Sequence, residues 1–159
     1  PLDKLVDVTL SGCGNVLSLP TVWNLPLLRD LLLSDMDSLT RLTSSVGLGS
    51  SKPLSLSLRK LELRRMRSLE KWTGAAMNSS TLISPVLETL SIYDCPKIII
   101  LDEHHLHPLV KLHIENCTNL ESIRSLQGLT SLEHLEIIFC SSLIGIPDLH
   151  NLGGSLREL

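Results

Sequence analysis

Apolar residues recur along the chain at a fixed spacing that repeats from one end to the other. In each copy two aliphatics lie three residues apart and a third follows two residues later; a cysteine or methionine and two more apolar residues come next at intervals of three. Six copies of a six-position pattern in one phase exceed chance, so the chain is built from internal repeats of 22 to 30 residues. The copies are Leu5, Val8, Leu10, Cys13, Val16, Leu19; Leu28, Leu31, Leu33, Met36, Leu39, Leu42; Leu58, Leu61, Leu63, Met66, Leu69, Trp72; Leu87, Leu90, Ile92, Cys95, Ile98, Leu101; Leu109, Leu112, Ile114, Cys117, Leu120, Ile123; and Leu132, Leu135, Ile137, Cys140, Leu143, Ile146.

The spacing predicts one short strand in each copy. Residues two apart, such as Leu90 and Ile92, point to the same side of an extended strand, and the residues between them point the other way. A single repeat cannot bury its apolar side alone, so successive copies must stack, with strands about 4.8 Å apart in a parallel sheet. The pattern therefore predicts an α/β leucine-rich-repeat solenoid, a horseshoe with a parallel β-sheet on its concave face.

The segments that connect these strands show few signs of helix. Six prolines interrupt them, which predicts irregular, extended or 3₁₀ backbone on the convex side, with one helical turn near 126–129. Two Ser- and Gly-rich inserts, 43–52 and 73–84, are expected to be mobile surface loops. The prolines are Pro20, Pro26, Pro85, Pro96, Pro108 and Pro147.

Both ends of the chain interrupt the repeat. The sequence begins just ahead of one copy and stops at Leu156 and Leu159, the first positions of a seventh. Neither end carries the polar capping repeat that solenoids use to cover their terminal cores. We therefore expect residues 1–159 to be a leucine-rich-repeat domain fragment, with six complete repeats and the start of another.

Composition excludes several functional classes. The chain has 37 leucines but one Phe, one Tyr and two Trp, as expected for many copies of one packing environment. A net charge of −3 gives no basic field for nucleic acid. No apolar run approaches the roughly 20 residues that cross a bilayer, so no membrane contact is expected.

Cysteine and histidine offer no convincing chemistry. All four cysteines share one repeat position, where the side chain turns inward, so we expect them to be structural, reduced and inert, as in a cytoplasmic protein. Zinc-type spacing is absent, and the cluster of His104, His105 and His107 reads as a solvated loop. No nucleophile elbow, phosphate loop or metalloprotease signature occurs. We expect no catalytic residue, metal or cofactor in this segment, and hence no enzyme.

The side chains between the aliphatics should form a partner-binding surface on the concave face. The third copy contributes a basic stripe of Arg59, Lys60, Arg64, Arg65 and Arg67, which admits two interpretations. One is a site for an acidic partner; the other is cross-strand pairing with Asp30, Asp35 and Asp94. The candidate contact residues are Arg59, Lys60, Arg64, Arg65, Tyr93, His113, Glu115, His134, Glu136 and Phe139.

Three large side chains are expected at exposed positions, and the role of two of them has two possible explanations. Tyr93 lies beside Arg64, a combination common at interface anchors. Ile138 and Phe139 are either anchors of the same kind or residues that contact following repeats.

The stretches Leu87-Glu-Thr-Leu-Ser-Ile-Tyr-Asp-Cys-Pro96 and Leu126-Gln-Gly-Leu-Thr-Ser-Leu-Glu-His-Leu-Glu-Ile137 resemble the C-terminal repeats of plant nucleotide-binding leucine-rich-repeat disease resistance proteins, especially the coiled-coil class. The resemblance implies a cytoplasmic immune receptor whose repeats recognise a pathogen effector, directly or through a guarded host protein. It also implies autoinhibitory contact with the receptor's own nucleotide-binding domain. ADP or ATP would bind that domain and not these residues.

Two other classes remain open. An extracellular receptor ectodomain is suggested by the glycosylation sequons at Asn78 and Asn116, although the regular 24-residue extracellular repeat is missing. Substrate-recognition repeats of a ubiquitin ligase also contain cysteine, but they carry a helix in each crossover, which the prolines here disfavour.

Overall fold

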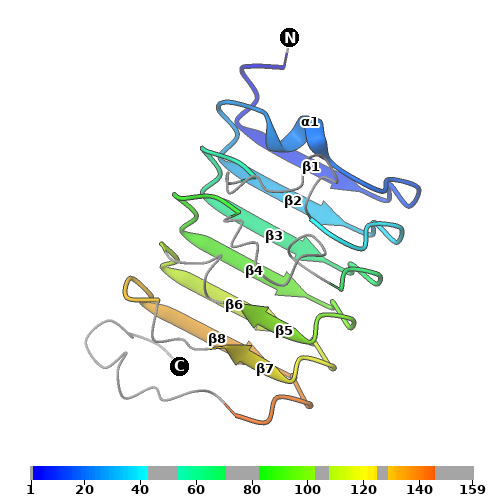
Figure 1. The fold of residues 1–159 in the computed structure, drawn as a ribbon, viewed down its shortest axis with the longest axis vertical. Helices are drawn as coiled ribbons and strands as arrows, with labels where there is room; N and C mark the ends of the chain where they lie inside the picture. The colour runs from blue at the N-terminus through cyan, green and yellow to red at the C-terminus, as the bar shows by residue number, and fades with distance from the viewer. Residues whose placement is uncertain (1, 43–53, 71–82, 103–107, 125–128, 146–159) are drawn as a thin grey trace, which may run out of the picture.

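The fold is a stack of parallel strands, one from each copy of the repeat (Figure 1). A computed structural model describes residues 2–42, 54–70, 83–102, 108–124 and 129–145. Its main sheet has six strands in the order β1-β2-β3-β4-β6-β8. These strands are β1 (Asp7–Ser11), β2 (Asp30–Ser34), β3 (Lys60–Arg64), β4 (Thr89–Tyr93), β6 (Lys111–Glu115) and β8 (His134–Ile138).

The strands pair in the register that the repeat predicts. Leu61 of β3 lies opposite Leu90 of β4, which lies opposite Leu112 of β6, and Leu135 of β8 completes the row. All four are essentially buried. The next inward-pointing aliphatic of each strand is also buried in β3, β4 and β6, but only partly buried in β8. Burying one such leucine stabilises the fold by about 1.5–3 kcal/mol, and the gain requires a neighbour on each side. The prediction of a leucine-rich-repeat solenoid is confirmed.

The residue after each strand turns the chain out of the sheet with a left-handed backbone. Gly12 has φ 69°, and its five equivalents have φ between 49° and 55° although none is glycine. In this conformation the backbone N–H reaches across to the next repeat; the amide of Asp35, for example, donates to the Arg64 carbonyl at 3.1 Å. The five are Asp35, Arg65, Asp94, Asn116 and Phe139, and we call this row the turn column.

The convex side is more ordered than the sequence suggested. Short strands β5 (Ile100–Asp102) and β7 (Ser122–Arg124) form a second parallel pair, because equivalent extended segments of successive repeats come within hydrogen-bonding distance. Pro20, expected only to interrupt structure, is the first residue of the one-turn helix α1 (Pro20–Trp23), where its missing N–H costs nothing. No 3₁₀ segment occurs in the described ranges.

Several expectations lie outside the described residues. They are the insert 43–52, nearly all of the insert 73–84, and residues 126–128 of the expected helical turn. Eight further residues named above also lie outside the described ranges. They are His104, His105, His107, Asn78, Trp72, Ile146, Leu156 and Leu159. Within the described part, no helix has the length and apolar character needed to cross a bilayer.

The cysteines form a ladder beneath the strands. Each thiol donates to the carbonyl two residues earlier, as in Cys95 to Tyr93 at 3.3 Å and Cys117 to Glu115 at 3.6 Å. Burial raises the pKa of Cys95 to about 12 and that of Cys117 to about 11. Cys13 and Cys140 are only partly buried, and all four thiols are free.

Candidate functional site

Side chains from four adjacent strands make a continuous row across the concave face. The Arg64 guanidinium of β3 lies over the Tyr93 ring of β4, with its carbon 4.9 Å from the ring centroid. The Tyr93 ring in turn lies 4.8 Å from the His113 ring of β6, centroid to centroid, at an interplanar angle of 38°. His113 Nδ1 is 2.6 Å from Oε2 of Glu136 on β8. We call Arg64, Tyr93, His113 and Glu136 the cross-strand array.

His113 contacts two carboxylates at once. Its Nε2 lies 3.4 Å from Oε2 of Glu115, on the side opposite the Glu136 contact. A neutral imidazole carries one N–H and donates to one carboxylate, whereas an imidazolium donates to both. Whichever form is present, two negative charges face at most one positive charge, so this end of the array is acidic.

Glu62 anchors the opposite end of the array. It lies in the middle of β3, and its side chain is only 11% exposed because the longer side chains on either side cover it. Its carboxylate accepts a hydrogen bond from Arg64 and lies 3.8 Å from Lys60 Nζ. Glu62 therefore fixes the guanidinium that stacks on Tyr93. The sequence offered a signal for this contact, since residues two apart share one face of a strand.

Every cation of the basic stripe has an acidic partner. Arg59 pairs with Glu88, and Arg67 lies 3.9 Å from Asp37. Arg65 donates two hydrogen bonds of 2.7 Å to Asp35, as the cross-strand interpretation anticipated. Lys60 departs from that interpretation, because it pairs with Glu62 of its own strand although Asp30 is its neighbour in register.

The hydrogen bonds between Arg65 and Asp35 shift the pKa values of both side chains. The Arg65 guanidinium, helped by the Ser34 hydroxyl, holds the pKa of the Asp35 carboxyl far below its ordinary value. The same bond raises the pKa of Arg65. Each charge is thereby engaged within the turn column and is less available to a partner.

The structure gathers some of the predicted contact residues and separates others. Arg64, Tyr93, His113, Glu115 and Glu136 come together in or beside the array. Arg59 and Lys60 lie at the start of β3, and His134 at the start of β8, whereas Arg65 and Phe139 occupy the turn column. Sequence reasoning missed Glu62, Glu88 and Asp37 as partners of the stripe.

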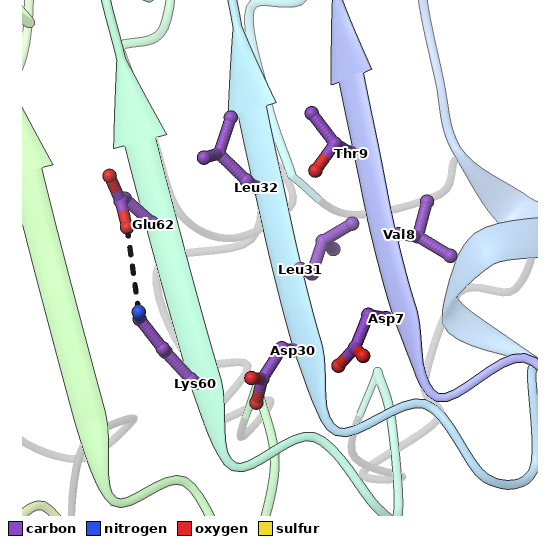
Figure 2. A pocket seen from close by; sticks show the side chains of 8 residues that line it. All are labelled: Asp7, Val8, Thr9, Asp30, Leu31, Leu32, Lys60 and Glu62. Carbon is purple, nitrogen blue, oxygen red and sulfur yellow. Dashed lines mark ion pairs between the residues drawn. The ribbon is translucent and has the colours of Figure 1, made fainter.

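A shallow hollow of about 190 Å³ lies over β1, β2 and β3 (Figure 2). Leu31 and Leu32 line its middle, and Asp7 and Asp30 stand side by side at one rim. The pair of Lys60 and Glu62 closes the far side. The hollow is wide and open, which suits a side chain from a partner protein better than a small molecule.

The described residues give little support to metal or thiol chemistry. No group of three or more His, Cys, Asp or Glu side chains among them is arranged to hold a metal ion. Cys95 and Cys117 are buried and their pKa values are raised, so their thiols are poor nucleophiles. The concave face presents charged side chains, aromatic rings and a shallow hollow, which are features of a binding surface.

The chain is similar to plant proteins. It is 32% identical over 145 residues to the Arabidopsis thaliana protein SUPPRESSOR OF npr1-1, CONSTITUTIVE 1, a match that covers 91% of this chain and 9% of that protein. It is 27% identical over 139 residues to RGA4 of Solanum bulbocastanum, which is named for disease resistance, covering 86% of this chain and 14% of the relative. The chain thus spans a small part of either relative. No family model matches it.

Among solved structures, the leucine-rich repeat domain of the type III effector XopL aligns with 99% of this chain and 69% of its own. The two are 17% identical and superpose with a TM-score of 0.46. The fold assignment rests on the strand register and the burial of the repeat leucines, and not on this likeness.

Proposed function

We propose that the chain is the protein-recognition module of an intracellular plant immune receptor. Its concave face would bind a pathogen effector, or a host protein that an effector modifies, and would also help to hold the receptor's nucleotide-binding domain inactive. The two plant relatives support the immune context, since one of them is named for disease resistance. Their greater length accommodates a receptor of which these repeats form one part.

The cross-strand array is the observation that carries the proposal. Arg and Tyr are enriched among residues that dominate binding energy at protein interfaces. Here they are ordered before a partner arrives, because Glu62 holds Arg64 and the His113 ring lies against Tyr93. Preordered side chains lose less conformational entropy on binding. The array spans four strands, roughly 14 Å from the strand spacing, which suits a protein surface.

The experiment expresses the full-length polypeptide in leaves together with a panel of pathogen effectors and measures cell death. Tyr93→Ala and Arg64→Glu remove or reverse the array while leaving the buried leucines intact. Leu56→Ala, at a side chain 75% exposed in a connecting segment, is the matched control. Thermal unfolding of each variant establishes that it is folded.

A response to an effector that both array variants lose and the control keeps would support recognition through this face. Cell death without any effector in the array variants would support the autoinhibitory contact. Array variants that respond to every effector as the unaltered protein does would overturn the proposal.

A further inference from the structure

Phe139 is an exposed aromatic residue in a backbone conformation that aromatic residues disfavour. Its φ is 52°, and its side chain is 76% exposed. The left-handed region suits Gly, Asn and Asp, and a bulky residue there signals strain that something else must justify. The turn column needs a left-handed residue at this point, but nothing about the turn needs a phenyl ring.

The other non-glycine members of the turn column gain contacts within the protein. Asp35 and Arg65 bind each other through two hydrogen bonds, and Asn116 donates from its amide to the Asp94 carboxylate. For Phe139 no ring stacking or cation–π contact is found among the described residues. The Phe139 ring is exposed and makes no such contact there, so it is available to contact another molecule.

The surroundings of Phe139 are apolar at the centre and acidic at the edge. Ile138, half-buried, precedes it and lies opposite Glu115 in register. Glu136 lies three residues before Phe139 on the concave face, and Asp94 is two positions from Phe139 along the turn column. Among the residues that the structure describes, no lysine or arginine forms an ion pair with Glu115 or Glu136, whereas Arg65 attracts Asp94 electrostatically.

This end of the sheet differs in charge from the basic stripe. Around β3 five cations pair with four carboxylates, because Lys60 and Arg64 share Glu62, so most of the charge of the stripe is compensated. Around β6 and β8, Glu115 and Glu136 share one imidazole, which leaves negative charge beside the exposed ring. Charge complementarity therefore favours a positively charged partner at this end.

We propose that Phe139 and Ile138, with the carboxylates of Glu115 and Glu136, form a docking site for a basic segment of a partner protein. A lysine or arginine of that segment lies over the Phe139 ring and extends its charge to the carboxylates, combining a cation–π contact with an ion pair. The inference deepens the proposed function, on which it rests, because it names the chemistry of the partner that the concave face selects.

The test uses two fluorescent ten-residue peptides, one rich in arginine and leucine and the other with glutamate in place of arginine. Binding to the full chain is measured by fluorescence anisotropy at low and moderate salt. We expect the arginine peptide to bind at least about tenfold more tightly than the glutamate peptide, as one or two such contacts provide. Phe139→Asn keeps a residue that tolerates the left-handed turn and should lose about tenfold in affinity.

Ile144→Asn is the matched control, since it removes another apolar side chain, 88% exposed, from the same end of the solenoid. Its affinity should stay within about twofold of the unaltered chain, an energetic difference below about 0.5 kcal/mol. Equal binding of the two peptides, or arginine-peptide binding that Phe139→Asn leaves unchanged, would overturn the docking site. If the leaf response still depended on Tyr93 in that case, the proposed function would stand without it. Peptide binding as expected, with no dependence of the leaf response on the array, would overturn the proposed function and leave a basic-segment site.

Discussion

The Arg65 guanidinium donates two hydrogen bonds of 2.7 Å to the carboxylate of Asp35, the residue at the same position one repeat earlier. Both residues sit in the turn column with positive φ, so the pair ties two strained turns together. A bidentate pair of this kind is better ordered than most surface ion pairs. The Ser34 hydroxyl donates to Asp35 and also lies 3.2 Å from Arg65 Nη2, which completes a small network at the end of β2 and β3.

The Asp35 pair predicts how acid affects stability. Because the folded pKa of Asp35 lies below its ordinary value of 3.8, its carboxylate stabilises the fold fully at neutral pH, and this contribution shrinks as pH falls below that value. We expect Asp35→Asn to be less stable at pH 7 and to lose stability less steeply between about pH 4 and pH 2. Urea unfolding over a pH series measures both effects.

Asp37→Asn provides the control for this prediction. Asp37 lies near Asp35 but reaches Arg67 only at 3.9 Å, with both side chains more than half exposed. Its unfolding curve should follow the unaltered protein through the acid range. An Asp35→Asn protein with the same acid slope as the unaltered chain would contradict the assigned role of the Arg65 bond.

Leu90 tests the stacking of the repeats. It is completely buried between Leu61 and Leu112, so Leu90→Ala leaves a cavity that neighbours on both sides line. We expect a loss of about 2–5 kcal/mol in the free energy of unfolding, and no folded protein for Leu90→Asp. Leu56→Ala, at an exposed leucine, should stay within about 0.5 kcal/mol. Equal effects of the two alanine substitutions in chemical denaturation would refute the repeat assignment.

The thiol ladder predicts an order of chemical reactivity. Burial raises the pKa of Cys95 and Cys117 well above neutrality and also blocks reagent access. In the folded protein at pH 8, an alkylating reagent should therefore modify the partly buried Cys13 and Cys140 first. Cys95 and Cys117 should react only at the rate of unfolding, as peptide mass spectrometry over time would reveal. Rapid labelling of Cys95 in a protein with a native unfolding transition would show that the ladder is open.

The strand register was predictable from the sequence because the aliphatics have the same spacing in every repeat. Only a parallel stack of the strands buries all of them. Leu61, Leu90, Leu112 and Leu135 align as that logic requires. The turn column was not predictable in the same way. Gly, Asp or Asn, which tolerate the left-handed region, occupy four of its six positions. Arg65 and Phe139 have no such preference, so their conformation follows from the geometry of the stacked turns.

Pairing within the candidate site was only partly visible in the sequence. Lys60 pairs with Glu62 and not with Asp30, its neighbour in register. This choice depends on side-chain length and burial, which the register alone does not give. The contact of His113 with both Glu115 and Glu136 likewise requires rotamers on two strands. The short pair β5 and β7 arises on the convex side from the closeness of successive repeats, with no aliphatic alternation to mark it.

The turn column also predicts substitutions of opposite sign at its two ends. An added Cβ at Gly12 meets no neighbouring atom, so Gly12→Ala suffers only the left-handed backbone, at a cost of about 1–2 kcal/mol. Phe139→Asn replaces a residue that disfavours the same conformation with one that tolerates it, and we expect a gain of about 0.5–1 kcal/mol. Chemical denaturation of both variants gives the two signs directly. A Phe139→Asn protein less stable than the unaltered chain would mean that the ring packs within the fold, and the strain at Phe139 would then no longer argue for a contact with a partner.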